Sequence, residues 1–163
     1  MKNAAISLHH TSFTVSNLEE AEKFFIELFG MERIGGGLYD FDYIRRTVAF
    51  PDAVLKISVL AFPQSNGTFS HWVELIEYVQ PRGKSTDTAT NLPGNAHLCF
   101  QVNDIEAEYR RLSDQGVRFK GLPQEVSYGM NKGARAVYFN GPDNIALELF
   151  QPAPPAVGKN EYV

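Results

Sequence analysis

The chain repeats one short pattern, once in each half of its 163 residues. The first copy, HTSFTVSNLE, begins at His10, and the second, HLCFQVNDIE, begins at His97. Each half also ends on a similar apolar segment with one carboxylate, VELI around Glu74 and LELF around Glu148. The duplication predicts two similar modules, each with one His near its start and one Glu near its end.

Hydrophobic periodicity predicts the same order of elements, β-α-β-β-β, in both halves. In the first half the expected elements cover residues 8–15, 18–29, 43–50, 55–62 and 71–79. In the second half they cover residues 96–102, 105–115, 118–121, 134–140 and 145–150. A capping box of Ser16 and Glu19 is expected to begin the first helix, and Gly30 to end it. Asn103 and Gly116 are expected to bound the second helix.

These elements predict the fold class α+β. The first module is expected over residues 4–80 and the second over 96–152. The polar stretch 81–95, which contains proline and glycine, is expected to link them. Residues 153–163 are expected to form a flexible tail.

Charge and composition exclude several classes of function. The net charge of −4 and the absence of a basic stripe argue against a nucleic-acid partner. No apolar run approaches the roughly 18 residues of a membrane span, and we expect no secretory signal. Cys99 is the single cysteine, which excludes an internal disulfide and fits a reducing compartment. We therefore expect a cytoplasmic protein that acts on a small molecule.

Strand alternation decides which side chains share a face. In each of four expected strands, one candidate metal ligand lies opposite the main row of aliphatic side chains. These ligands are His10, Glu74, His97 and Glu148. If the four faces met, two imidazoles and two carboxylates would form a divalent metal site. The alternative is that each Glu pairs with Arg or Lys. His9 and His71 are out of phase and are not expected to be ligands.

The pattern resembles the vicinal oxygen chelate superfamily, which includes glyoxalase I, extradiol dioxygenases and bleomycin resistance proteins. The resemblance covers about residues 6–152. It rests on LHHTSFTV with His10, VEL with Glu74, GNAHL with His97 and GPDNIALEL with Glu148. It implies paired βαβββ modules whose eight strands form a cup around one divalent ion. It also implies Ni, Co, Mn, Zn or Fe as that ion.

Four protein ligands resemble glyoxalase I and the related epimerases, and imply a lyase, isomerase or epimerase acting by proton transfer. The metal would chelate a small oxygenated substrate and polarise its carbonyl. Glu148, and after it Glu74, would act as the base. Thr14 and Tyr78 stand where some bacterial glyoxalase I enzymes have Arg and Asn, so glutathione is not expected as co-substrate.

Two other functions stay open on the same fold. One is a ring-cleaving extradiol dioxygenase with Fe(II), which usually has two His and one Glu as ligands. The other is a drug-binding or resistance protein. A homodimer is expected, with each metal site either within one chain or shared between two.

Substrate contacts are expected from two further segments. Arg45 or Arg46, on the expected strand 43–50, could bind a substrate carboxylate. Tyr128 and Lys132 lie in a glycine-flanked loop, residues 127–133, that could act as a lid. An ordinary surface role is open for all of these residues.

Overall fold

The computed structural model describes residues 8–64 and 71–155. The chain divides into two compact units, Met1–Thr86 and Asp87–Val163. Each unit is described by itself below, as the N-terminal unit and the C-terminal unit. Within the described residues, no helix has the length and apolar character needed to cross a bilayer.

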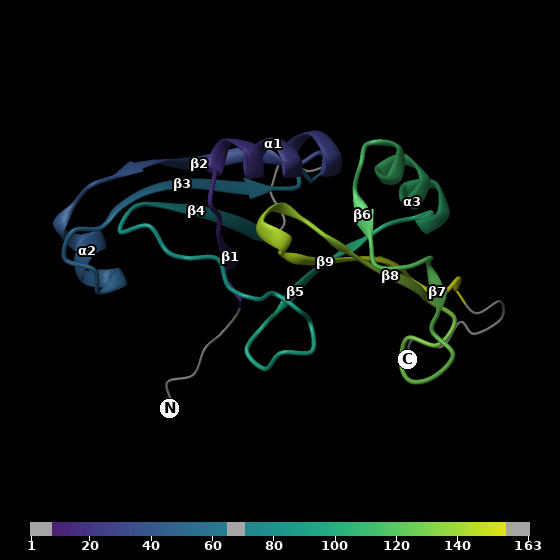
Figure 1. Cartoon of the computed structure of the whole chain (residues 1–163). Helices are drawn as coiled ribbons and strands as arrows, with labels where there is room; N and C mark the ends of the chain where they lie inside the picture. Colours follow the sequence, from purple (N-terminus) through teal and green to yellow (C-terminus); the bar gives the residue numbers. More distant parts are fainter. Residues whose placement is uncertain (1–7, 65–70, 156–163) are drawn as a thin grey trace, which may run out of the picture. The chain divides into compact units, whose positions relative to one another are not determined.

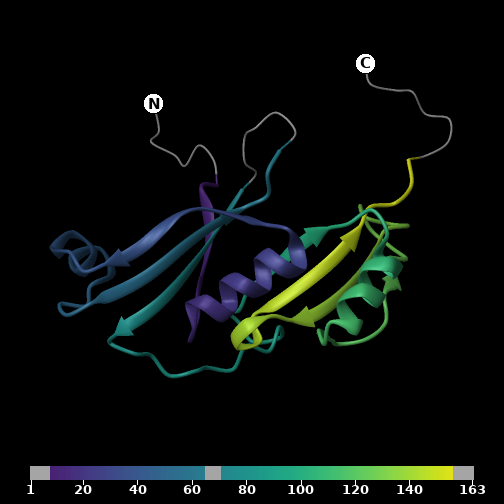
Figure 2. The same ribbon diagram turned by 90° about the horizontal axis from the view of Figure 1, so that it is seen from above.

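The N-terminal unit is a four-stranded mixed sheet with one helix packed on it (Figure 1). Its elements are β1 (His10–Thr14), α1 (Leu18–Phe29), β2 (Glu32–Tyr39), α2 (Asp42–Val48), β3 (Val54–Ala61) and β4 (Trp72–Gln80). The strand order is β1-β4-β3-β2, and only the β1–β4 pair is parallel. The long strands β2, β3 and β4 run side by side in Figure 2. Helix α1 packs on β3 and β4.

The C-terminal unit repeats this plan. Its elements are β5 (His97–Gln101), α3 (Ile105–Asp114), β6 (Arg118–Phe119), β7 (Gln124–Glu125), β8 (Arg135–Asn140), the 3-10 turn η1 (Pro142–Asn144) and β9 (Ala146–Gln151). The strand order is β5-β9-β8-β6, and the short β7 also pairs with β8. As in the first unit, the first strand pairs in parallel with the last. Two mixed sheets with few helices confirm the predicted α+β class.

Helix α1 follows its prediction at both ends, although its cap is one residue later than expected. The side chain of Asn17, not that of Ser16, accepts hydrogen bonds from the amides of Glu19 and Glu20, at 3.1 and 3.3 Å. Gly30 ends the helix in the left-handed region, at φ 67°. The buried face consists of Leu18, Ala21 and Phe25.

Helix α3 shows the same shift of one residue. The side chain of Asp104, not that of Asn103, accepts from the amide of Ala107 at 3.0 Å. Asp and Asn are both strong N-caps, so local sequence alone does not distinguish neighbouring candidates.

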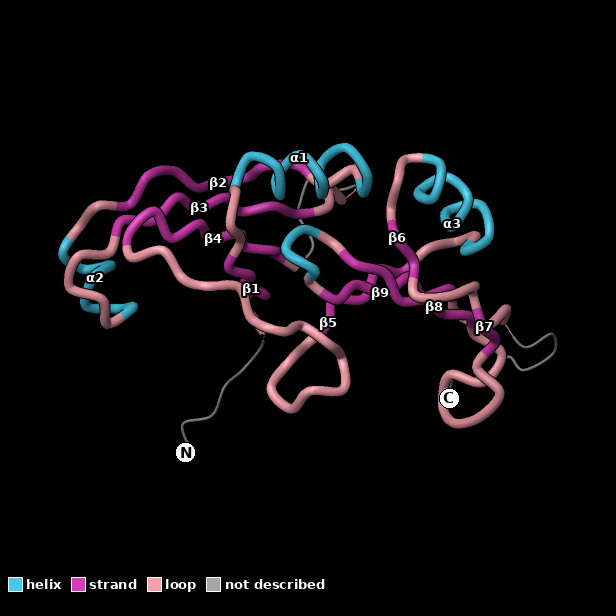
Figure 3. The backbone as a smooth tube through the Cα atoms, in the orientation of Figure 1, coloured by secondary structure: helices cyan, strands magenta, loops and turns pink. Residues whose placement is uncertain are grey.

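The predicted strand over residues 43–50 is wrong. Residues Asp42–Val48 form α2, which Figure 3 marks as a short helix between β2 and β3. Its first turn carries Asp42 and its last turn carries Arg45 and Arg46, so the charges favour the helix dipole at both ends. The missing strand is β2, which runs through the glycine triplet 35–37.

Gly36 explains why that triplet belongs in a strand. Its φ is 117°, and a Cβ built on it would lie 2.1 Å from the carbonyl oxygen of Ile57 on β3. The strands approach each other so closely here that only glycine fits.

Replacing Gly36 with Ala is therefore expected to lower the free energy of unfolding by about 3 kcal/mol, through backbone strain and overpacking. Urea unfolding followed by circular dichroism would measure this. The control is Gly83→Ala, because nothing lies within 4 Å of a Cβ at Gly83. The control should change stability by less than about 0.5 kcal/mol. Equal stability of the two variants would contradict the close approach.

The last long strand of each unit is tied to the start of that unit's helix. Glu77 on β4 accepts a hydrogen bond from the amide of Leu18 at 3.0 Å. Gln151 on β9 accepts one from the amide of Ile105 at 2.9 Å. Each acceptor satisfies an amide in the first turn that has no partner within its own helix. Sequence reasoning missed both residues.

Among the residues that the structure describes, Glu77 is the buried charged one, and two cations compensate its charge. Lys56 Nζ lies 3.9 Å from one carboxylate oxygen, and an Arg82 guanidinium nitrogen lies 3.3 Å from the other. Burying a carboxylate without partners would cost several kcal/mol, roughly, so these contacts permit its place under α1.

Candidate functional site

In the N-terminal unit, the sheet places His10 and Glu74 on one face. Strands β1 and β4 are parallel, with His10 opposite Trp72 and Ser12 opposite Glu74. The two side chains are therefore diagonal neighbours, and His10 Nε2 lies 3.6 Å from Glu74 Oε2. Glu77, an odd number of residues further on, points to the opposite face, toward α1. The pair therefore lies on the face that α1 leaves uncovered.

The C-terminal unit reproduces this arrangement. His97 stands opposite Ala146, and Cys99 stands opposite Glu148. His97 Nε2 lies 3.1 Å from Glu148 Oε2. The side chains of His97 and Glu148 are 41% and 14% exposed, against 39% and 23% for His10 and Glu74. Both imidazoles are thus accessible to a ligand, and Glu148 is the less exposed carboxylate.

The donor atoms in each pair fit one divalent ion. Two ligand atoms about 2.1 Å from a metal, at a right angle, lie about 3.0 Å apart. The observed separations of 3.1 and 3.6 Å are close to this value, so a small closure would bring both donors onto one ion. Among the described residues, neither Glu74 nor Glu148 has Lys or Arg within 4 Å. The alternative, in which each Glu pairs with Arg or Lys, therefore has no support among the described residues.

The described residues of each unit offer no third ligand for its pair. Within residues 8–64 and 71–155, no group of three or more His, Cys, Asp or Glu side chains is arranged to hold a metal. Each unit supplies half of the predicted quartet. The quartet itself stays a prediction.

His9 contributes to the N-terminal pair, although it is out of phase with the ligands. Its Nδ1 lies 2.8 Å from the Nδ1 of His10, and its ring packs edge-on against Trp72 at 4.8 Å between centroids. A hydrogen bond at Nδ1 leaves the Nε2 of His10 directed at Glu74. Such contacts orient metal-binding imidazoles in many proteins.

Tyr138 is a candidate functional residue that sequence reasoning missed. It stands opposite Glu148 in the antiparallel β8–β9 pair, and its hydroxyl lies 3.2 Å from the Nε2 of His97. Its ring packs edge-on against that of His97, at 5.0 Å between centroids. The signal was available, because alternation along residues 134–140 puts Tyr138 on one face of a strand next to the Glu148 strand.

Glu148 lies between two side chains that can donate hydrogen bonds. Cys99 on β5 and Tyr138 on β8 are its cross-strand neighbours, and both interact with its carboxylate. The corresponding neighbours of Glu74 are Ser12 on β1 and Val59 on β3. The two pairs are therefore alike in geometry but differ in the side chains beside the carboxylate.

These surroundings also change the acidity of both donors. Burial, and then the nearby Glu148 carboxylate, raise the pKa of Cys99 to about 12. The same two causes raise the pKa of Tyr138. Both groups therefore stay protonated at neutral pH and keep donating to Glu148.

Cys99 is expected to be an unreactive thiol in the metal-free protein. At pH 8, a pKa of about 12 leaves roughly a thousandth of the thiolate of a free cysteine. Iodoacetamide labelling followed by mass spectrometry should be slower in proportion, and should accelerate as the pH rises toward 12. The Glu148→Gln variant should react faster, because it removes a charge that opposes ionisation. Labelling at the rate of a free thiol would contradict this environment.

The contacts that the structure gives for Arg45, Tyr128 and Lys132, three of the expected substrate contacts, do not involve the His–Glu pairs. Arg45 is on helix α2, where its guanidinium pairs with Asp40 and Asp42. Tyr128 is 89% exposed, and the Lys132 amide donates to the Gly129 carbonyl within the loop. A substrate role for these residues stays a prediction.

Comparisons with known proteins give a consistent result. Residues 9–139 match the family described as the glyoxalase/bleomycin resistance protein/dioxygenase superfamily. A 2-epi-5-epi-valiolone epimerase from Actinomyces sp. is 33% identical over 156 residues, which cover 89% of this chain and 79% of that enzyme. A lactoylglutathione lyase from Schizosaccharomyces pombe is 28% identical over 87% of this chain, and this chain spans 46% of that enzyme's length.

Solved structures share the fold. A glyoxalase family protein from Bacillus cereus superposes with a TM-score of 0.78 at 23% identity, covering 94% of this chain and 98% of its own. The fosfomycin resistance protein FosX from Listeria monocytogenes, crystallised with Mn(II) and sulfate, has a TM-score of 0.57 at 21% identity. That alignment covers 94% of this chain and 96% of FosX.

Proposed function

Because the chain belongs to the glyoxalase/bleomycin resistance protein/dioxygenase superfamily, we propose that it is a divalent-metal-dependent lyase, isomerase or epimerase. It would act by proton transfer on a small oxygenated substrate. One observation carries the proposal: each unit presents a His–Glu pair with the donor spacing of a metal site, on equivalent strands.

In this proposal His10, Glu74, His97 and Glu148 together hold one ion, either within one chain or across a homodimer. The ion supplies Lewis-acid polarisation of a substrate oxygen when bound. Two imidazoles and two carboxylates suit Mn, Co, Ni, Zn or Fe. The Mn(II) of the FosX structure supports a divalent metal in this fold.

Glu74 and Glu148 differ in how well each carboxylate could act as the catalytic base. Glu148 has Cys99 and Tyr138 as cross-strand neighbours, and hydrogen bonds from these groups favour its ionised form and its present position. Glu74 is more exposed, and its cross-strand neighbours are the small Ser12 and the apolar Val59. We therefore propose Glu74 as the proton acceptor and Glu148 as the fixed ligand, which reverses the order expected from the resemblance.

Tyr138 has a supporting role in this scheme. Its raised pKa keeps the hydroxyl protonated, so it can donate to Glu148 or to a substrate oxygen near His97. The apolar edge of its ring against His97 limits the rotation of that imidazole.

Among the lyase, isomerase and epimerase reactions, we favour epimerisation. The epimerase relative is 33% identical, and this chain covers 79% of it. Thr14 and Tyr78, at the positions expected for a glutathione site, do not offer the Arg and Asn of some glyoxalases. 2-Epi-5-epi-valiolone is therefore the first compound to test, and hemithioacetals of glutathione are the second.

The test is exchange of a carbon-bound proton. Protein reconstituted with Mn, Co, Ni or Zn is incubated with each compound in D₂O, and incorporated deuterium is followed by NMR. Exchange that requires metal supports the proposal. No exchange with any compound, together with iron in the purified protein and oxygen uptake with catechols, would overturn it in favour of the ring-cleaving dioxygenase.

A cytoplasmic homodimer is part of the same proposal. Light scattering on the metal-loaded and metal-free protein would measure the assembly. A monomer that still binds one equivalent of metal would assign all four ligands to one chain.

A further inference from the structure

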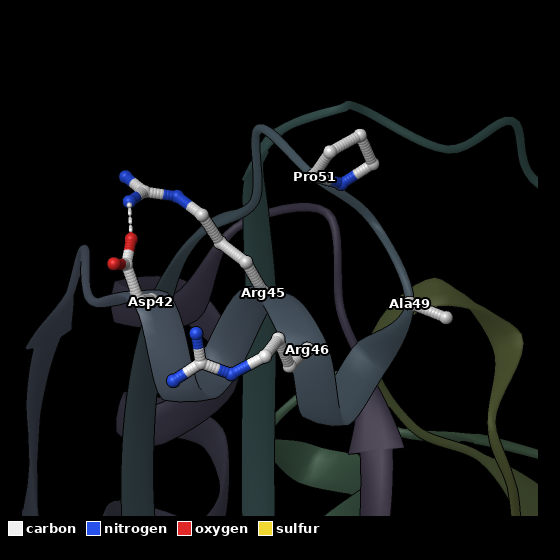
Figure 4. A pocket seen from close by; sticks show the side chains of 5 residues that line it. All are labelled: Asp42, Arg45, Arg46, Ala49 and Pro51. Carbon is white, nitrogen blue, oxygen red and sulfur yellow. Dashed lines mark hydrogen bonds and ion pairs between the residues drawn. The ribbon is translucent and has the colours of Figure 1, made fainter.

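The N-terminal unit carries a hollow of about 480 Å³ beside helix α2. We call it the α2 hollow, and Figure 4 shows its lining. The lining residues are Asp42, Arg45, Arg46, Ala49 and Pro51. Two of the five are arginines from the last turn of one short helix, so guanidinium groups dominate the donors available to a ligand.

The α2 hollow lies toward the sheet face that carries Glu74. Tyr78 is four residues along β4 from Glu74, and so shares its face. Phe50, which follows α2, packs edge-on against Tyr78 at 5.9 Å between ring centroids. Figure 1 shows α2 on the side of the sheet away from α1. Four residues of strand span about 13 Å, which is the distance along the sheet from Glu74 to this aromatic contact.

The two arginines differ in the charges they meet. Arg45 pairs with Asp40 and Asp42, so its guanidinium is held and neutralised within its own segment. The dashed line in Figure 4 marks the hydrogen bond from Arg45 to Asp42. Arg46 is exposed, and no carboxylate among the described residues lies within 4 Å of it. Arg46 is therefore the guanidinium that can bind a ligand, and Arg45 forms part of the wall.

Exposed aromatic side chains stand on either side of Asp42, one of the lining residues. Phe41 and Tyr43 stack at an interplanar angle of 15°, with centroids 6.1 Å apart, and both are exposed. Tyr43 is three residues before Arg46 on α2, a spacing that brings two helical side chains onto one face. Together the rings and Arg46 offer an apolar surface and a planar bidentate donor.

We propose that the α2 hollow is a binding subsite for a carboxylate carried on a ring-shaped body. Arg46 binds the carboxylate through its two-pronged guanidinium, and Phe41 and Tyr43 contact the ring. Arg45 and Arg46 together balance Asp40 and Asp42, so the local charge is nearly neutral and a monoanion fits better than a phosphate dianion. The carboxylate belongs either to the far end of the substrate or to a separate small ligand. The first case rests on the proposed function.

Direct binding to the metal-free protein tests the subsite independently of catalysis. Benzoate is titrated into ¹⁵N-labelled protein, with benzamide as the uncharged comparison. Amide shifts are expected in residues 41–51 with benzoate, and far weaker ones with benzamide. Arg46→Gln should weaken benzoate binding about tenfold, the loss of one charge-assisted contact.

The matched control is Arg110→Gln, an exposed arginine on α3 in the other unit, which should leave the affinity unchanged. Arg46→Lys keeps the charge without the planar fork and should fall between the two. Equal benzoate affinity in wild type and Arg46→Gln, or equal binding of benzamide, would overturn the proposal.

Kinetics distinguishes the two sources of the carboxylate. With a substrate that shows deuterium exchange, a KM raised about tenfold at unchanged kcat in Arg46→Gln assigns the hollow to that substrate. An unchanged KM, with benzoate binding retained, assigns it to a separate ligand. Absence of exchange in the wild type would overturn the proposed function and leave the benzoate result standing.

Discussion

Replacing His97 with Ala is expected to strip the protein of its metal. After dialysis against metal-free buffer, the wild type should retain about one equivalent of a divalent ion per site, measured by plasma mass spectrometry. The variant loses an imidazole donor that lies 3.1 Å from its partner carboxylate oxygen. Changes in residues that only support a ligand weaken metal affinity by about 10- to 100-fold, and loss of the ligand itself should exceed that.

His10→Ala should lose metal equally, because the quartet draws one imidazole from each unit. The matched control is His9→Ala, which removes an imidazole from the adjacent position. His9 contacts the Nδ1 of His10 and is not a ligand in the proposal. It should weaken affinity by about 10- to 100-fold at most, which is less than the loss of His10 itself. A variant series in which His10→Ala and His97→Ala keep full metal would overturn the metal site.

Glu74→Gln is expected to abolish proton transfer while leaving metal in place. Loss of a general base typically lowers kcat by about 10²- to 10⁴-fold. Gln keeps the size of the side chain and one oxygen that can face the metal, so His10, His97 and Glu148 should retain the ion. The measurement pairs the rate of deuterium exchange with the metal content of the same sample.

Glu148→Gln is the comparison that assigns the roles. It removes the charge of the carboxylate that lies between Cys99 and Tyr138, so its main effect should be weaker metal binding. With metal in excess, part of its exchange rate should return, whereas Glu74→Gln should stay inactive. The reverse pattern would make Glu148 the base.

The sequence contained most of the information about the His–Glu pairs, because strand alternation is a strict rule with a period of two. Helix α1 is confirmed from Leu18 to Phe29, since a clear apolar stripe and a terminal glycine bound it. The one-residue errors at Asn17 and Asp104 arose because adjacent residues were both good caps.

The larger error, at residues 43–50, has a different cause. Aromatic and β-branched residues there favour a strand locally, while the three glycines of β2 disfavour one. The structure reverses both preferences because β2 must approach Ile57 so closely that side chains do not fit. Such tertiary contacts are not visible in local sequence. Tyr138 and Glu77 were missed for a related reason, since each gains its role from a neighbour on another strand or helix.

The hydrogen bonds from Glu77 and Gln151 to the helix amides disfavour a shifted register of β4 and β9. Each lies three residues beyond a candidate ligand on the same strand, and faces the other way. If β4 or β9 turned over by one residue, the ligand would be buried under the helix and the tie would face the open side. Such a shift would leave a helix amide without its partner and would bury a carboxylate without a cation. Together these changes would destabilise the shifted register by roughly several kcal/mol. The hydrogen bonds of Glu77 and Gln151 thus favour one register of each strand. The same register places Glu74 and Glu148 on the open face of the sheet.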